Sequence, residues 1–236
     1  MKRKRVEELD STRELTGLVQ QGCLVAKDAA FNLRDFIENA SNIAFLAVKD
    51  CEKELDRMER RIDEEITSAI TQVTEAEARE LLACLKFIID LERIGDLAWS
   101  ICMRLQKLGT RLPKDDSQDF MSMARVLEKM LEAVHTGYVS RDLAPATWVL
   151  QNDPEIDRCC HAVFHRHLAA GDVHREYSTS IMLMAQAFER AGDHAKNLGE
   201  ELFHLVEGRS MRHEPKGPKR TRPVPASRRS RAEQEN

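Results

Sequence analysis

The sequence predicts an all-α fold: two tandem, pseudo-symmetric three-helix bundles with six helices in all. The first observation is composition, because only 5% of the 236 residues are aromatic and only three prolines, Pro113, Pro145 and Pro154, fall within 10–207. Such a chain lacks the aromatic, β-branched and turn residues of a β-sandwich or barrel. The second is an internal repeat, since LERIGDLA at 91–98 recurs as FERAGDHA at 188–195. A repeated unit of this length indicates tandem bundles.

Capping residues and helical periodicity place the six elements. Thr74 and Glu77 form a capping box ahead of the third helix, Ser41 and Asn42 cap the second, and Asp142 caps the fifth. The expected helices span residues 10–40, 42–71, 75–107, 116–138, 142–169 and 172–207.

Proline, glycine and charge divide the chain into three regions. Pro113 and the polar residues that follow it mark the middle of the chain. Pro154 is expected to kink the fifth helix. Gly109, Gly137 and Gly171 are expected at helix boundaries. We therefore expect a first repeat over 1–109, a second over 110–213 and a disordered basic tail over 214–236.

The charge is distributed unevenly. Nine Lys and Arg against three Glu give residues 209–236 a charge of +6, which leaves −10 on the rest of a chain whose net charge is −4. An acidic body argues against a nucleic-acid-binding domain, so no nucleic acid partner is expected. The tail either keeps the protein soluble or contacts an anionic membrane surface.

The six cysteines indicate a reducing compartment. They form no CxxC pair and lie within apolar helical stretches, and no apolar segment follows the basic N-terminus as in a signal peptide. We expect reduced, core-filling thiols in a cytoplasmic protein, with the adjacent Cys159 and Cys160 serving packing.

Each copy of the repeated motif contains a glycine inside a predicted helix, Gly95 and Gly192. Glycine destabilises a helix interior by about 1 kcal/mol relative to alanine. Its presence in both copies predicts a close approach of two helices, or access to the neighbouring carboxylates.

Carboxylates recur at helical spacing on both halves. Residues three or four apart share a helix face, where like charges repel. The expected stripes are Glu52, Asp56, Glu59 and Asp63, followed by the pairs Glu92–Asp96, Asp153–Asp157 and Glu189–Asp193. Arg93 and Arg190 inside the motifs, or a bound cation, would offset the repulsion. All-carboxylate sites suit Mg²⁺, Mn²⁺, Ca²⁺, iron or Zn²⁺.

These segments resemble the PhoU family of bacterial phosphate-signalling regulators. The similarity lies in residues 91–96 (LERIGD), 189–197 (ERAGDHAKN) and 205–213 (LVEGRSMRH), and it extends over roughly 10–213. Ala191 replaces the isoleucine that is usual in the motif.

The resemblance implies multinuclear iron or zinc clusters on the bundle surface. By matching position, the ligands would be all ten carboxylates named above. It also implies a regulator without catalytic activity that restrains the phosphate-starvation response through a sensor histidine kinase and the ATPase of a phosphate transporter. We further expect a homo-oligomer, a dimer.

Two other groups of residues offer competing interpretations. Glu132–His135 and Glu201–His204 have the E-x-x-H spacing of a buried di-iron enzyme or metal-storage protein, which forms the alternative function. His161, His165 and His167 crowd the fifth helix; His161 and His165 have zinc-ligand spacing, but a solvated or helix-end cluster is the preferred interpretation.

Overall fold

A computed structural model describes residues 2–109, 111–169 and 175–208. Within these ranges the chain forms six α-helices and one short 3₁₀-helix, with no strand, as the predicted fold class requires. They are α1 (Lys2–Asn39), α2 (Asn42–Ala69), η1 (Ile70–Gln72), α3 (Glu75–Leu108), α4 (Lys114–Ser140), α5 (Leu143–Ala169) and α6 (Arg175–Glu207).

The predicted caps close the helices as expected. The hydroxyl of Ser41 accepts from the Ala44 N–H at 3.3 Å, and the carboxylate of Asp142 accepts from the Ala144 N–H at 3.0 Å. Thr74 has both halves of its capping box with Glu77. These side chains satisfy backbone N–H groups that have no partner within the helix.

Two boundary predictions need correction. The first helix begins at Lys2 rather than near residue 10, because residues 2–9 contain neither Gly nor Pro and consist mainly of good helix formers. Gly109 does end α3 in the left-handed conformation, with φ of 61°. Gly137, however, lies inside α4 and is packed against Leu202 and Pro145, so it serves helix packing and not a boundary. The start of the sixth helix at 172, Gly171 and the tail over 214–236 lie outside the described residues.

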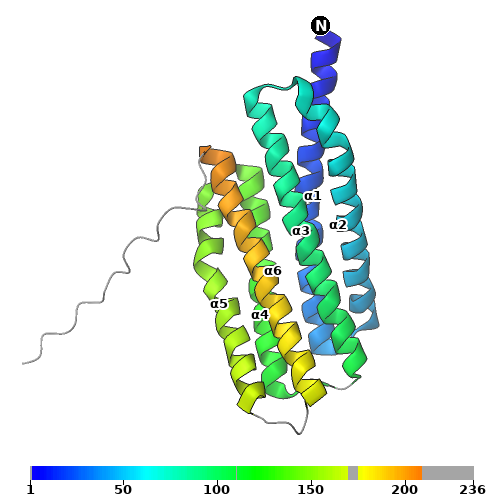
Figure 1. The fold of residues 1–236 in the computed structure, drawn as a ribbon, viewed down its shortest axis with the longest axis vertical. Helices are drawn as coiled ribbons and strands as arrows, with labels where there is room; N and C mark the ends of the chain where they lie inside the picture. Colours follow the sequence, from blue (N-terminus) through cyan, green and yellow to red (C-terminus); the bar gives the residue numbers. More distant parts are fainter. Residues whose placement is uncertain (1, 110, 170–174, 209–236) are drawn as a thin grey trace, which may run out of the picture.

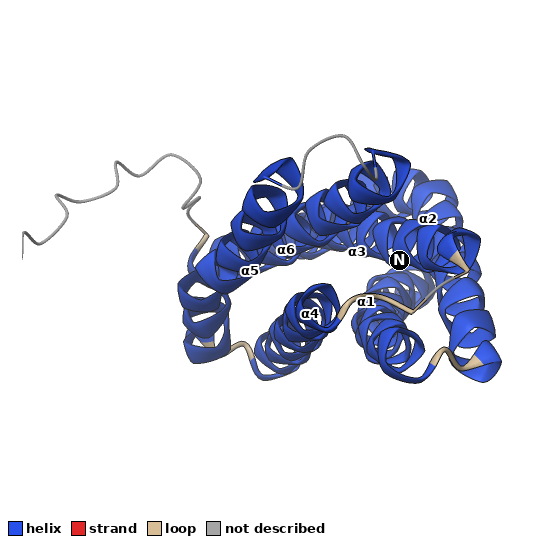
Figure 2. Cartoon of the chain, turned by 90° about the horizontal axis from the view of Figure 1, so that it is seen from below, coloured by secondary structure: helices blue, strands red, loops and turns tan. Residues whose placement is uncertain are grey.

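The helices form two layers. Seen end-on, α5, α6, α3 and α2 lie side by side in a curved layer, and α4 and α1 pack against its inner side (Figure 2). Helices α1–α3 form one bundle and α4–α6 the other, and the bundles meet where α3 contacts α6 and α1 contacts α4 (Figure 1). The buried apolar residues of both bundles form one continuous core. None of the described helices combines the length and apolarity that a membrane span needs.

Candidate metal sites on two acidic faces

The first acidic face consists of residues on the two neighbouring helices α2 and α3, and it unites six of the predicted ligands. Its members are Glu52, Asp56, Glu59 and Asp63 of α2 with Glu92 and Asp96 of α3. Glu92 is buried, Asp63 is exposed and the other four are half-buried. The face therefore runs from the α2–α3 groove out to solvent.

Gly95 explains how the two helices bring these carboxylates together. A Cβ atom on Gly95 would lie 2.7 Å from Cδ1 of Leu55 and 3.6 Å from the Cα of Glu52. Leu55 is fully buried between α2 and α3. The predicted close helix approach is thus present, and it places the α2 stripe beside the Glu92–Asp96 pair.

Glu92 and Glu52 of the first face are harder to ionise than isolated carboxylates. Burial, with the nearby charges of Asp96 and Glu59, raises the pKa of Glu92 to about 7. Burial also raises the pKa of Glu52, with added repulsion from Asp96 and Asp56. In both cases desolvation comes first and the like charges reinforce it.

Positive charge on this face is sparse. The guanidinium of Arg93 lies 3.5 Å from Oε2 of Glu92 and 3.5 Å from Oδ2 of Asp96, while Arg60 pairs with Asp56. Oε2 of Glu92 is buried and has no hydrogen-bond partner among the described atoms. A buried carboxylate oxygen without a donor is costly, and a cation would satisfy it.

The second acidic face repeats this geometry on α5 and α6 with four of the predicted ligands, Asp153, Asp157, Glu189 and Asp193. Here a Cβ on Gly192 would lie 3.0 Å from Cδ1 of Ile156, so the second motif glycine also permits close helix packing. Burial and neighbouring carboxylates raise the pKa of Asp157 and of Glu189.

The two faces differ in how their charge is offset. Asp153 is almost fully buried, and the ammonium of Lys196 donates to its Oδ2 at 2.6 Å. Arg190, which was expected to offset the charge, is exposed and forms no ion pair within the described part of the chain. The second face is also smaller, because Cys160 and Phe164 stand where the first continues with Glu59 and Asp63.

The donor chemistry of both faces fits a hard or borderline cation, because every candidate ligand is a carboxylate oxygen. The side chains as they stand do not converge on a point: in 2–109, 111–169 and 175–208, no group of three or more His, Cys, Asp or Glu is arranged to hold a metal ion. Coordination would therefore require the half-exposed carboxylates to turn toward one another.

The E-x-x-H pairs do not build a di-iron shell. Glu132 is exposed on α4 and His135 is half-buried. The carboxylate of Glu201 is buried but accepts from the Lys86 ammonium at 2.9 Å and lies 3.2 Å from Nδ1 of His204. A lysine thus occupies the position that a metal would need.

The three histidines of α5 do not come together as one site. His161 and His165 are exposed on α5. His167, in the last turn of α5, places Nε2 3.0 Å from Asp116 and Nδ1 3.2 Å from the Ser178 hydroxyl. This cluster lies at a helix end as expected, but His167 is a buried partner of Asp116 and is not solvated.

The six cysteines are free, and Cys159 and Cys160 are each 9% exposed within the core. Their packing role is confirmed. Burial raises the pKa of the Cys160 thiol to about 11, which keeps it protonated and unreactive near neutral pH.

The polar contacts between α3 and α6 were not anticipated from the sequence. Nδ1 of His194 lies 2.8 Å from Asp90, and Lys86 bridges to Glu201, so α3 and α6 are joined by charges as well as by apolar contacts. One sequence feature could have pointed to these contacts: the two copies of the repeat differ where His194 in the second copy replaces Leu97 in the first.

The fold and these faces define a class: a tandem-repeat, all-helical protein that carries an acidic face on each repeat. The PhoU domain family matches this sequence twice, over residues 25–105 and 120–202. The chain therefore belongs to the PhoU family.

Relatives and solved structures agree with that assignment. The chain is 28% identical over 218 residues to the phosphate-specific transport system accessory protein PhoU homolog 1 of Thermotoga maritima, covering 88% of this chain and 93% of the relative. It is 27% identical over 215 residues to the PhoU homolog of Pseudomonas aeruginosa, covering 87% and 86%.

The fold is similar to the crystal structure of PhoU from P. aeruginosa, with a TM-score of 0.69, 24% identity and coverage of 88% and 99%. It is also similar to the phosphate transport system regulatory protein PhoU from Streptococcus pneumoniae, with a TM-score of 0.70, 17% identity and coverage of 87% and 98%.

Proposed function

We propose that this protein is an accessory regulator of phosphate transport that acts without catalysis of its own. Membership of the PhoU family supports the proposal, as do the names of its relatives in T. maritima and P. aeruginosa, which are phosphate-specific transport system accessory proteins. Its partners would be the transporter ATPase and a sensor histidine kinase, and its effect would be negative regulation of the phosphate-starvation response. Two copies of the chain would act together as a dimer in the cytoplasm.

The single observation that supports the site is the first acidic face, in which the buried Oε2 of Glu92 has no hydrogen-bond donor and only a distant ion pair with Arg93. Glu52, Asp56, Glu59 and Asp63 would hold cations together with Glu92 and Asp96. A bound cation would neutralise repelling carboxylates and stabilise the α2–α3 groove. The second face would hold a cation less tightly, because the Lys196 ammonium already neutralises Asp153.

The regulatory role is tested by deleting the gene and following a phosphate-starvation reporter in phosphate-rich medium. Expression should rise in the deletion strain and return to the repressed level with the wild-type chain. A reporter that stays repressed after deletion would contradict the regulatory role.

The metal site is tested separately, by elemental analysis of protein purified without chelator. The paired substitutions Glu92→Gln and Asp96→Asn should remove the metal of the first face, whereas Glu132→Gln, on an exposed part of α4, should leave it. Equal metal content in all three proteins, or none in the wild type, would contradict the metal site and leave the regulatory test independent of it.

A further inference from the structure

One side of α3 leaves apolar side chains uncovered beside the first acidic face. Leu82 and Ile89 are large apolar residues that are 47% and 39% exposed. They are seven residues apart, as are Ile89 and Asp96, so all three lie along one line of the helix. We call this line, from Leu82 to Asp96, the α3 strip. It begins as an apolar surface and ends at carboxylates of the first acidic face.

The chain leaves α6 beside the Leu82 end of the α3 strip. Gly208 follows α6 with a φ of 71°, and its N–H donates to the His204 carbonyl at 2.9 Å. A Cβ atom on Gly208 would lie 3.2 Å from Nη1 of Arg79 in α3. Arg79 precedes Leu82 by three residues, which is about one turn of the same helix. Residues 209–236, the C-terminal segment, therefore continue from a point next to the strip.

Charge favours contact between the C-terminal segment and the first acidic face. The segment has nine Lys and Arg against three Glu, a charge of +6. Among the described residues, Glu52, Glu59 and Asp63 of the face have no hydrogen-bond or ion-pair partner, because its ion pairs involve the other three carboxylates. The face thus has unpaired negative charge, and the segment that starts nearby has an excess of positive charge.

The C-terminal segment is long enough to follow the strip to the face. Glu92 lies about 20 Å from Arg79 along α3, at a rise of about 1.5 Å per residue. The two lysines of the segment are Lys216 and Lys219. An extended chain spans about 3.3 Å per residue, so Lys219 can lie up to about 36 Å from Gly208. The first acidic face is therefore within the reach of a lysine ammonium.

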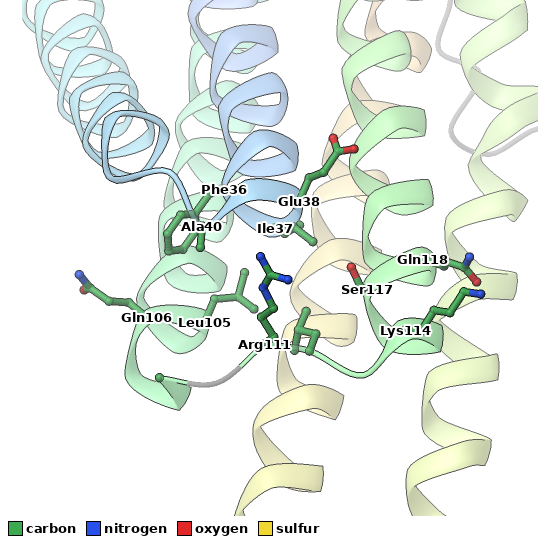
Figure 3. Close-up of a pocket in the computed structure, with 12 residues that line it drawn as sticks. Phe36, Ile37, Glu38, Ala40, Leu105, Gln106, Arg111, Lys114, Ser117 and Gln118 are labelled. Carbon is green, nitrogen blue, oxygen red and sulfur yellow. The ribbon is translucent and has the colours of Figure 1, made fainter.

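The cavity at the far end of α3 is out of reach of the same lysines. It has a volume of about 590 Å³ and lies where α1 and α3 end and α4 begins (Figure 3). Gly109, which lines it, lies about 45 Å from Arg79 along α3. The lysines therefore distinguish docking on the strip from docking at this cavity.

The second acidic face offers less to the C-terminal segment. It has four carboxylates instead of six, and Lys196 already neutralises Asp153. Along the described residues of α6 between Asp193 and Gly208, the one exposed large apolar residue is Val206, in the last turn. The second face thus lacks the apolar path that leads along α3 to the first.

We infer that the C-terminal segment docks on the α3 strip of its own chain. Apolar residues such as Met211 cover Leu82 and Ile89, and the Lys and Arg residues lie against the carboxylates of the first acidic face. The segment lies outside the two PhoU domain matches, the second of which ends at residue 202, so the contact goes beyond the family fold. When docked it shields the face from cations, a regulatory consequence that rests on the proposed function.

Carbodiimide cross-linking of the full chain tests the docking, because the reagent joins a lysine amine to a carboxylate in contact with it. Chelator keeps metal off the face. A mixture of unlabelled and isotope-labelled protein lets mass spectrometry separate links within one chain from links between two chains. We expect Lys216 and Lys219 to be linked within one chain to carboxylates of the first acidic face, in a yield that added salt lowers by screening.

Paired substitutions separate docking from chance encounters. Leu82→Gln with Ile89→Gln should lower the yield about fivefold or more, because apolar contact is lost while every charge is kept. Leu183→Gln, which replaces a leucine of α6 that is 38% exposed, should be linked as the wild type is. Arg220→Gln with Arg222→Gln, which changes no residue of the described helices, should lower the yield about twofold or more.

Several outcomes would overturn the proposal. These are no link from Lys216 or Lys219, links only between two chains, links only to the second acidic face, or an unchanged yield in Leu82→Gln with Ile89→Gln. An equal loss in Leu183→Gln would overturn it as well. The cross-linking is done without metal, and the metal site is measured by elemental analysis, so failure of the docking would leave the proposed metal site standing.

Discussion

Gly95 of α3 lies so close to Leu55 of α2 that a Cβ atom on Gly95 would come within 2.7 Å of Cδ1 of Leu55. Leu55 is fully buried, so its side chain has little room to move aside. The equivalent contact in the second bundle is less tight, with 3.0 Å between such a Cβ on Gly192 and Cδ1 of Ile156.

Gly95→Ala is therefore expected to destabilise the protein. Overpacking a core costs about 1–3 kcal/mol, which exceeds the gain of about 1 kcal/mol from the better helix propensity of alanine. Gly17→Ala is the matched control, because nothing lies within 4 Å of its Cβ position in α1, and it should be neutral or stabilising. Urea unfolding measures both, and a Gly95→Ala protein more stable than the wild type would contradict the expectation.

The raised pKa of Glu92, about 7, predicts how stability changes with pH. The folded state holds this proton more tightly than the unfolded chain, whose glutamate pKa is near 4.5. The metal-free protein should therefore lose free energy of unfolding as pH rises from about 4.5 through about 7.

Glu92→Gln should flatten that pH dependence, because glutamine does not ionise. Glu132→Gln, which replaces an exposed glutamate of α4, should leave the pH dependence of the free energy of unfolding as it is in the wild type. Urea unfolding in the presence of chelator, at a series of pH values, gives the slopes. Parallel slopes for the wild type and Glu92→Gln would show that another group is responsible.

Lys196 should weaken cation binding at the second acidic face. Its ammonium lies 2.6 Å from Oδ2 of Asp153, where an incoming cation would have to displace it. Lys196→Gln should therefore bind Mn²⁺ more tightly than the wild type in a calorimetric titration. Lys129→Gln on α4 should behave as the wild type, and an unchanged or weaker affinity in Lys196→Gln would argue against a cation site on this face.

Asp116 is expected to be the most sensitive polar residue of the second bundle. It is 1% exposed and is bound by both Arg166 and His167. Asp116→Ala leaves these two groups without their acceptor, which should lower the free energy of unfolding by about 3 kcal/mol. Asp119→Ala removes the second, more exposed partner of Arg166 and should lower it by less than about 1 kcal/mol. Equal losses in the two variants would refute the buried network.

The helices and the two acidic stripes could be predicted because their signals are local. The Thr74–Glu77 capping box and the spacing from Glu52 to Asp63 involve residues three or four positions apart, which the helix itself brings together. The first helix was predicted too short, although residues 2–9 consist mainly of good helix formers.

The sequence by itself determined the six helices, the duplicated motif and the faces on which the carboxylates lie, since each follows from the period of an α-helix. Only the tertiary structure decided that α3 packs against α6, and with it the pairing of Asp90 with His194 and of Lys86 with Glu201. It also decided that Lys196, rather than Arg190, neutralises Asp153. The partners in these two pairs are more than 100 residues apart in the sequence, so helical periodicity could not predict them. They meet only because the apolar faces of the two bundles pack into one core.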